Sequence, residues 1–352
     1  ATAATCVCLT LVGALTNLAA QKQPDRAAGS QWPVEEIHGP ALPFDATLDE
    51  GTNISLDVSP DGRTIVFDLL GDLYTLPISG GAAARLTSGP AFDRQPRFSP
   101  DGKRIAFVSD LSGADNVWLA DSDGGNPTQL TSEKAALFVS PIWTFDGQYI
   151  LARNQGIVAL PVSGGTGFKF QGGSAAAPSP EGRYIYFNNR GQGGWQVYRY
   201  DRKTEASAPI TGGPGGSVRP LVSRDGRYLA YSKQVDLKQL LIIRDLRTGA
   251  ERVVFDGLDR DAQDYGFDGE VMPGYAFVPD ASAIVIAVGG KISRIDLATG
   301  SVAVIPFSAH VQMTLTKKVY VPRRIEDGER AALKMLRWTH LTPDGKRLVF
   351  GA

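Results

Sequence analysis

The sequence predicts an all-β fold, namely a β-propeller of four-stranded blades, six of them complete and a seventh partial. Three observations lead to this prediction. A short turn phrase recurs seven times at intervals typical of propeller blades, strand-like runs lie on both sides of these turns, and little of the chain has helical periodicity. A β-sandwich would not require so regular a recurrence.

The recurring turn phrase combines Ser or Thr with Pro, an acidic residue and Gly. Its acidic residue lies at positions 61, 101, 146, 181, 225, 280 and 344, in steps of 40, 45, 35, 44, 55 and 64 residues. Pro presets φ at the first central position of a turn, Asp suits the second, and Gly accepts a positive φ. The phrase departs from its pattern at Phe145, Glu181 and Ala281. We expect these departures to affect turn geometry and not the fold.

Runs rich in β-branched and aromatic residues predict the strands of each unit. Innermost strands are expected at residues 54–58 and 96–98, and second strands at 64–67, 104–108, 184–187 and 228–231. Third strands are expected at 72–76, 116–120, 196–200, 240–243 and 291–295, and outer strands at 84–87 and 128–131. Four strands per period is the arrangement of a propeller blade.

The seventh unit is short, because the sequence after the last turn phrase supplies only a second strand, at residues 346–350. A propeller closes its ring so that no blade keeps an open edge. Two alternatives follow. Either an N-terminal strand from the leader completes this blade, or the sequence is a truncated piece of a longer chain, which is our expectation.

The N-terminal residues differ in composition from the rest. Residues 1–20 carry no charge, and the apolar stretch 6–15 is too short to span a bilayer but has the length of a secretory h-region, with Ala19 and Ala20 near a plausible cleavage point. The alternative is an apolar N-terminus that is disordered or partly buried. We predict a signal-like segment at 1–20, a leader at 21–50 and the propeller at 51–352, in an exported and periplasmic protein with no membrane span.

Charge and residue usage exclude several functions. Lys and Arg number 36 against 37 Asp and Glu, so no general cationic excess is available for nucleic acid. The histidines are only His38, His310 and His340, which form no close pair for a metal site, and no Gly-x-Ser-x-Gly elbow occurs. We therefore predict no catalytic residue, cofactor or metal ion in this chain.

Contacts with a partner or with the central channel are predicted at a few charged residues. Asp93, Arg94 and Arg219 precede or begin inner strands, which line the channel of a propeller. Arg260 and Asp261 lie in a long acidic insert, residues 256–272. The segment 311–337 is basic. The alternative for each of these features is a solvated surface.

The turn phrases, together with the run Asp123-Gly124-Gly125-Asn126-Pro127, resemble TolB-type propeller repeats. More narrowly, residues 50–62, 68–74 and 273–280 resemble a family of exported bacterial proteins in which a TolB-like propeller precedes a metal-dependent amidohydrolase barrel. The resemblance covers roughly residues 45–352 and implies a parent protein that is a hydrolase.

The function predicted for this stretch is that of a non-catalytic scaffold that mediates protein interaction or substrate access. Its partner would be a C-terminal hydrolase domain or proteins of the cell envelope. Two alternatives stay open: a free-standing TolB-type periplasmic interaction module, and the propeller of a prolyl-oligopeptidase-like peptidase.

Overall fold

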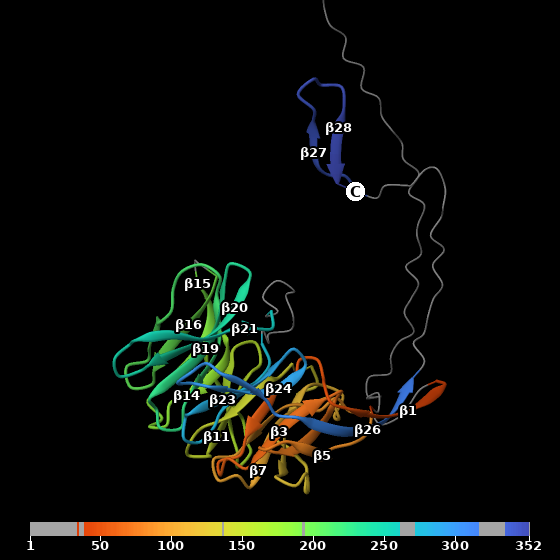
Figure 1. Ribbon diagram of the computed structural model, residues 1–352, viewed down its shortest axis with the longest axis vertical. Helices are drawn as coiled ribbons and strands as arrows, with labels where there is room; N and C mark the ends of the chain where they lie inside the picture. The colour runs from red at the N-terminus through yellow and green to blue at the C-terminus, as the bar shows by residue number, and fades with distance from the viewer. Residues whose placement is uncertain are drawn as a thin grey trace, which may run out of the picture.

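The computed structural model describes residues 34, 39–135, 137–191, 194–260, 272–316 and 335–351. Within them, six sheets of four antiparallel strands follow one another along the chain and form a six-bladed propeller, coloured from orange in blade 1 to blue in blade 6 (Figure 1). Each blade uses four consecutive strands, so its hydrogen bonds join residues that are close in sequence.

The strand bounds are as follows. Blade 1 contains β2 (Leu56–Val58), β3 (Thr64–Leu69), β4 (Asp72–Pro77) and β5 (Gly81–Arg85). Blade 2 contains β6 (Arg94–Phe98), β7 (Arg104–Ser109), β8 (Asn116–Asp121) and β9 (Thr128–Gln129). Blade 3 contains β10 (Val139–Trp143), β11 (Tyr149–Arg153), β12 (Ile157–Pro161) and β13 (Phe168–Gln171).

Blade 4 contains β14 (Ser174–Pro178), β15 (Tyr184–Gly191), β16 (Gly194–Asp201) and β17 (Ala206–Pro209). Blade 5 contains β18 (Ser217–Val222), β19 (Tyr228–Val235), β20 (Lys238–Asp245) and β21 (Glu251–Leu258). Blade 6 contains β22 (Ala276–Phe277), β23 (Ala283–Val288), β24 (Lys291–Asp296) and β25 (Val302–Val304). The prediction of four-stranded blades is confirmed, although the outer strand of blade 1 begins earlier than expected.

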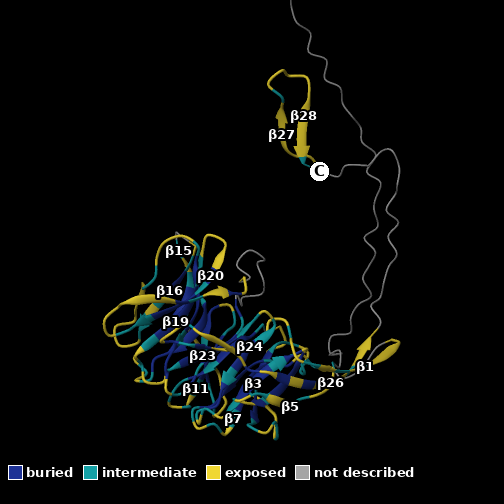
Figure 2. Cartoon of the chain, viewed as in Figure 1, coloured by how far each residue is buried: buried dark blue, intermediate teal, exposed yellow. Residues whose placement is uncertain are grey.

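The hydrophobic core is divided among the junctions between blades, and Figure 2 shows buried residues through the interior of the propeller. The described residues form six clusters, each of which joins two neighbouring blades. In β7, Ile105 and Phe107 pack toward blade 1, whereas Ala106 and Val108 pack toward blade 3. A strand buried on both faces needs apolar residues at successive positions, which explains the continuous apolar runs in the sequence.

The turn phrase forms the same turn in each of the six blades. The nitrogen of the fourth residue donates to the carbonyl oxygen of the first at 2.8–2.9 Å. Gly62 has φ of 73°, and Ala281 takes φ of 54° where Gly was expected. The departure at Phe145 leaves the turn unchanged, because Gly147 N still donates to Thr144 O at 2.9 Å. Our expectation that this departure alters turn geometry is therefore wrong.

The ring closes through strands that belong to no blade. After blade 6, β26 (Phe307–Thr316) pairs in parallel with β5, the outer strand of blade 1, and β1 (Ala41–Leu48) pairs antiparallel with β26. Figure 1 shows β26 and β5 side by side although they are far apart in sequence. Phe307, Ala309 and Val311 are buried against blade 1. We call β1 and β26 the ring latch.

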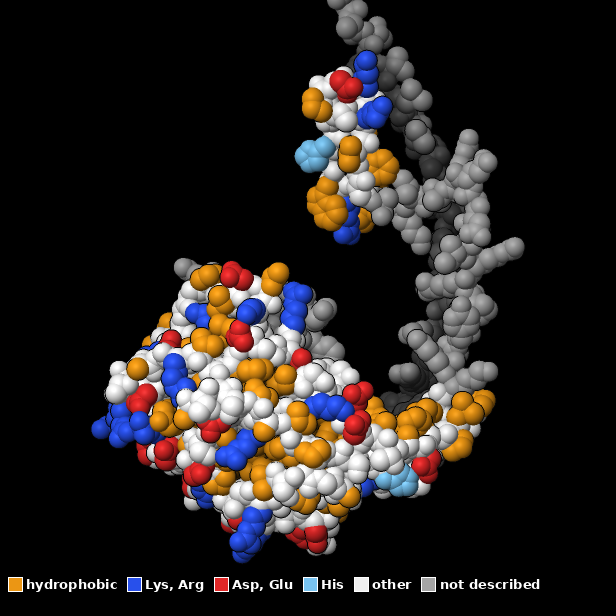
Figure 3. All heavy atoms as spheres, viewed as in Figure 1, with side chains coloured by type: hydrophobic (Ala, Val, Ile, Leu, Met, Phe, Trp, Pro, Cys, Tyr) orange, Lys and Arg blue, Asp and Glu red, His pale blue; other side chains and the backbone are white. Residues whose placement is uncertain are grey.

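The seventh turn phrase forms a hairpin of β27 (Arg337–Leu341) and β28 (Leu348–Gly351), which pair with each other in a two-stranded sheet. The N-terminal strand does not complete this unit, because β1 pairs with β26. The hairpin exposes large apolar side chains, including Trp338 at 78% and Leu341 at 68%. Figure 3 shows hydrophobic side chains, in orange, on the surface of this hairpin.

Several sequence predictions fall on residues outside the described ranges. These are the signal-like segment 1–20, most of the leader, most of the acidic insert and residues 317–334 of the basic segment. Residues 311–316 belong to β26, so the alternative that the whole basic segment is a solvated loop is wrong at its start. Within the described residues, we find no helix with the length and hydropathy needed to cross a bilayer.

A buried ion pair connects blade 1 to the ring latch. Asp72 is 2% exposed, and its Oδ2 lies 2.6 Å from Nη2 of Arg85. Nη1 of Arg85 donates to the carbonyl oxygen of Gln312 in β26 at 2.8 Å. Burial raises the pKa of Asp72 to about 6, against the opposing effect of Arg85.

This raised pKa predicts a pH dependence of stability. The folded chain binds a proton at Asp72 more tightly than the unfolded chain, whose carboxyl has a pKa near 4. The stabilisation is therefore present below about pH 4 and is lost as the pH rises through about 6. Between pH 7 and pH 4, we expect the wild type to gain about 2–3 kcal/mol relative to Asp72→Asn. Urea unfolding of both proteins between pH 4 and pH 7 checks this expectation. If the free energy of unfolding changed with pH by the same amount in both proteins, the expectation would be wrong.

Candidate functional site

The innermost strands of four blades carry a bulge at the same place. Gln95, Ser140, Ala175 and Arg219 each lie six residues before the acidic turn residue of their blade and have φ between 50° and 58°. The strand register shifts there in β6, β10, β14 and β18. A bulge with a left-handed residue re-aims the neighbouring side chains. Four unrelated residue types share this conformation, so the ring geometry and not local propensity imposes it.

Hydrogen bonds between these bulges form a belt around the ring axis. Ser140 N donates to Oε1 of Gln95 at 2.7 Å, and Nη1 of Arg219 donates to Oγ of Ser140 at 2.6 Å. Tyr275 Oη donates to the carbonyl oxygen of Arg219 at 2.6 Å, and Nη1 of Arg97 donates to that of Tyr275 at 2.9 Å. The belt thus joins blades 2, 3 and 5 to the start of blade 6.

Two arginines are buried at this belt. Arg97 is 6% exposed and Arg219 also 6%. A Cβ on Gly274 would lie 2.6 Å from Nη2 of Arg97 and 3.0 Å from Nη2 of Arg219, so both guanidinium groups converge on this glycine and require its lack of a side chain. Two guanidinium groups therefore lie close together at the axis of the propeller.

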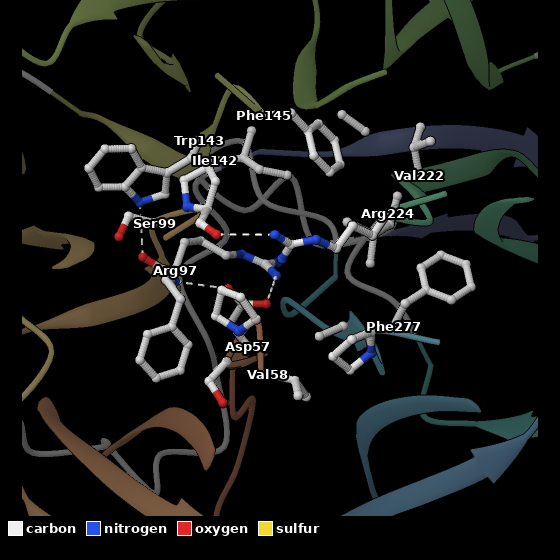
Figure 4. A pocket seen from close by; sticks show the side chains of 18 of the residues that line it. Asp57, Val58, Arg97, Ser99, Ile142, Trp143, Phe145, Val222, Arg224 and Phe277 are labelled. Atoms are coloured by element: carbon white, nitrogen blue, oxygen red, sulfur yellow. Dashed lines mark hydrogen bonds and ion pairs between the residues drawn. The ribbon is translucent and has the colours of Figure 1, made fainter. Parts of the chain in front are cut away.

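Asp57 is the acidic residue beside Arg97. Its Oδ1 lies 3.5 Å from Nη1 of Arg97, and its Oδ2 accepts a hydrogen bond from Phe98 N at 2.9 Å (Figure 4). Burial raises the pKa of the Asp57 carboxyl, although Arg97 opposes this shift. Burial also raises the pKa of the Tyr275 phenol, so Tyr275 is neutral and acts as a hydrogen-bond donor.

A cavity of about 140 Å³ opens on the axis at the face of the ring that carries the turn phrases. All six blades contribute to its walls, and its charged lining residues are Asp57, Arg97 and Arg224. Deeper along the axis lies a second, smaller space of about 10 Å³, whose lining residues include Arg97, Arg219 and Tyr275. We call the outer space the channel mouth and the inner constriction its floor.

Arg224 extends across the channel mouth. It occupies the Pro position of the turn phrase in blade 5, and its Nη2 donates to the carbonyl oxygen of Pro100 in blade 2 at 3.2 Å. Blades 2 and 5 lie opposite each other in a ring of six, and Figure 4 shows the side chain extended between them. Arg224 is exposed, so incoming groups can meet its charge. The lining residues of the mouth and floor thus include three arginines and one aspartate.

The structure divides the predicted contact residues. Arg219 lies at the channel floor. Asp93 is buried at the junction of blades 1 and 2, where its backbone nitrogen donates to the carbonyl oxygen of Gly71 at 2.8 Å. Arg94 forms an ion pair with Asp115, with 2.9 Å between Nη2 and Oδ2. Arg260 is exposed, and Asp261 lies outside the described residues. Of the predicted contact residues that the structure describes, Arg219 lines the channel floor, whereas Asp93, Arg94 and Arg260 line neither the mouth nor the floor.

Sequence reasoning missed Asp57, Arg97 and Arg224. A signal for the first two exists, because both lie four residues before the acidic turn residue, where the other four blades have apolar residues. Arg224 stands where four blades have Pro. Most blades have an apolar residue or Pro at these repeat positions. A charged residue there is not needed to form the blade, and it is therefore a candidate for a functional role. Within the described ranges, no group of three or more His, Cys, Asp or Glu side chains could hold a metal ion.

The fold defines a class, the six-bladed propeller of four-stranded antiparallel sheets. Residues 55–163 match the family model of the tricorn protease N-terminal beta propeller domain. The chain is 30% identical over 116 residues to tricorn protease homolog 1 of Streptomyces coelicolor, a match that covers 33% of this chain and 11% of that protein. It is 34% identical over 77 residues to the uncharacterized protein Atu1656 of Agrobacterium fabrum, covering 21% and 26%. The matches thus span well under two thirds of either relative.

Solved structures show the same fold. TolB from Acinetobacter baumannii superposes with a TM-score of 0.59 at 20% identity, covering 73% of this chain and 66% of that one. The tricorn protease superposes with a TM-score of 0.51 at 12% identity, covering 78% and 36%. The chain is therefore a TolB- and tricorn-like six-bladed β-propeller.

Proposed function

We propose that this propeller is a non-catalytic docking module that binds an acidic polypeptide segment at the channel mouth and controls access to a neighbouring hydrolase domain. The observation that carries the proposal is the charge of the mouth and floor, where Arg97, Arg219 and Arg224 face a single aspartate among the lining residues. The hydrogen bonds of the belt hold the side chains of Arg97 and Arg219 in defined positions before a ligand binds. Binding therefore costs little conformational entropy at these two side chains.

The docking residues belong to a rigid scaffold and not to a catalytic centre. The buried tyrosine and arginines at the floor are engaged in hydrogen bonds that hold blades together. The space at the floor is only about 10 Å³, so we propose docking at one face instead of threading.

The parent protein that we propose is an exported, periplasmic hydrolase with the propeller at its N-terminal side. The resemblance of residues 50–62, 68–74 and 273–280 supports a metal-dependent amidohydrolase. The match of residues 55–163 to a tricorn protease domain supports a second candidate, a peptidase. A His-x-His strand in the reading frame after residue 352 would support the first, and Gly-x-Ser-x-Gly the second. Fractionation of cells that express the full gene tests export.

The exposed hairpin β27–β28 adds to this proposal. It repeats the turn of the blades, and Thr342 Oγ1 donates to Asp344 as the first turn residue does in blades 1, 2, 3 and 5. A lone two-stranded hairpin is marginally stable in water. We propose that it begins a further sheet that packs against the hydrolase domain or a second set of blades.

Binding of acidic peptide tests the docking proposal. Acetyl-hexaglutamate-amide is expected to bind the purified chain, and Arg224→Ala to weaken this binding by about fivefold or more, because an exposed charge at the mouth is lost. Isothermal titration calorimetry at low and high salt measures it, since screening weakens such contacts. Lys103→Ala, which removes a turn cation outside the mouth, is the matched control. Equal affinity for acetyl-hexalysine-amide would contradict the proposal.

A further inference from the structure

The Pro of the turn phrase has a structural role between blades. A Cβ on Gly62 would lie 3.2 Å from Pro279 Cδ, one on Gly102 3.3 Å from Pro60 Cδ, and one on Gly226 3.5 Å from Pro180 Cδ. Each Pro therefore packs against the turn Gly of the next blade. We call it the wedge proline.

The wedge is missing between blades 3 and 4, where Phe145 replaces Pro. Around a Cβ on Gly182, the nearest atom is Nη1 of Arg202 at 3.7 Å, so Phe145 does not cover this glycine. Phe145 instead lines both the channel mouth and a cavity of about 250 Å³ between blades 3 and 4. This junction therefore lacks the contact that a proline of the preceding blade makes with Gly62, Gly102 and Gly226.

This cavity is apolar at its base, and its sides carry aromatic residues together with the charged residues Asp146, Glu181 and Arg202. Leu151, 2% exposed, and Ile185, 5% exposed, lie at its base and belong to the core cluster of the two blades. Tyr149 and Phe168 form one wall, with ring centroids 6.1 Å apart at 79°, and Tyr200 lines another side. Phe168 is 53% exposed, so a large part of its apolar surface remains open to solvent.

We infer that this cavity is a side-chain pocket for a bulky apolar residue, tryptophan or phenylalanine in particular, of the same acidic polypeptide that docks at the channel mouth. The inference rests on the proposed function. Its volume is below the roughly 300–1,000 Å³ of small-molecule sites, which suits one side chain. Phe145 and Pro178 line both spaces, so the pocket adjoins the cationic mouth. The occupant therefore carries acidic residues and, a few residues away, an aromatic side chain.

Three peptides separate the contribution of the acidic residues to binding from that of the aromatic side chain. They are acetyl-Glu-Glu-Gly-Gly-Gly-Trp-amide, the same peptide ending in Ala, and the Trp peptide with Lys in place of Glu. Burial of an indole predicts that the Trp peptide binds the wild type about tenfold or more tightly than the Ala peptide. Calorimetry gives the affinities. A 5-fluorotryptophan version of the Trp peptide reports by fluorine NMR whether the indole is immobilised.

Two matched variants assign the site. Phe145→Pro restores the wedge with the residue that the turns of four other blades carry, and it is expected to reduce the affinity of the Trp peptide to that of the Ala peptide. Arg224→Pro makes the same change in blade 5, and it is expected to weaken both Glu peptides while the Trp-to-Ala ratio stays. Phe168→Ala is a third and milder variant, because this side chain is half-exposed at the wall of the pocket. It is expected to lower the ratio of Trp-peptide affinity to Ala-peptide affinity about threefold or more.

The outcomes are distinguishable. If both Glu peptides bind with equal affinity, or if Phe145→Pro leaves the ratio unchanged, the pocket inference is wrong. If neither Glu peptide binds better than the Lys peptide, the proposed acidic docking fails whatever the Trp contribution. If Phe145→Pro instead converts a dimer to a monomer in sedimentation, a second copy of the chain occupies the pocket and the inference is overturned.

Discussion

Phe307→Ala is expected to reduce the free energy of unfolding by about 3–5 kcal/mol, the range for deletion of a buried phenylalanine side chain. Phe307 is 5% exposed, and its ring centroid lies 5.2 Å from that of Phe67 in blade 1. It begins β26, the strand that joins the end of blade 6 to the outer edge of blade 1. The loss therefore weakens the closure of the ring as well as one core cluster.

Urea unfolding followed by circular dichroism measures this effect. Leu315→Ala is the matched control, because Leu315 lies in the same strand but is 43% exposed. We expect it to cost less than about 1 kcal/mol, as exposed substitutions do. Earlier proteolytic cleavage within residues 307–316 in Phe307→Ala would locate the weakening in the ring latch. Equal losses in the two variants would show that β26 does not hold the ring closed.

Asp57→Ala is the second large effect, a loss of about 3–5 kcal/mol, because the substitution removes one side of a buried ion pair together with the acceptor of Phe98 N. Asp57 lies beside Arg97 and also accepts the hydrogen bond of Phe98 N, so it joins blade 1 to blade 2. Its side chain is 18% exposed and lines the channel mouth. Water can reach it, so we expect the lower end of this range.

Two further substitutions separate the contribution of the ion pair with Arg97 from that of the hydrogen bonds of the carboxylate. Asp57→Asn keeps an acceptor for Phe98 N and is expected to lose less than Asp57→Ala. Asp61→Ala removes an exposed turn carboxylate, which accepts from Ser59 Oγ at 2.6 Å, and is expected to cost about 1 kcal/mol. The measurement is again urea unfolding, at pH 7. A loss at Asp57 no greater than at Asp61 would mean that the pair with Arg97 adds nothing.

Much of the blade structure could be predicted because a blade is local. Its strands are joined by short hairpins, so the turn phrase and the apolar runs on either side report directly on the fold. The continuous apolar runs also have a local cause, since residues such as Ile105 and Ala106 serve opposite neighbours. Ala281 shows that the turn itself tolerates a residue other than Gly when both flanking strands are paired.

The candidate site was predicted only in part. Arg219 was expected at the channel and lies at its floor, whereas Asp93 and Arg94 make contacts at the edge of blade 2. Arg219 lies six residues before the acidic turn residue of its blade, whereas Asp93 and Arg94 lie eight and seven residues before theirs, a difference that the sequence prediction did not use. The side-chain direction at Arg219 depends on a bulge with φ of 58°, which Arg does not favour by itself.

The amino-acid sequence by itself determined the six four-stranded blades and the turn that each repeats, because these depend on hydrogen bonds between neighbouring strands. Only the tertiary structure decided how the ring closes, since β26 and β5 are more than 200 residues apart. It also decided which side chains share the axis. Arg97, Arg219 and Tyr275 meet because blades distant in sequence are brought to one centre, a consequence of burying six interfaces that no local pattern encodes.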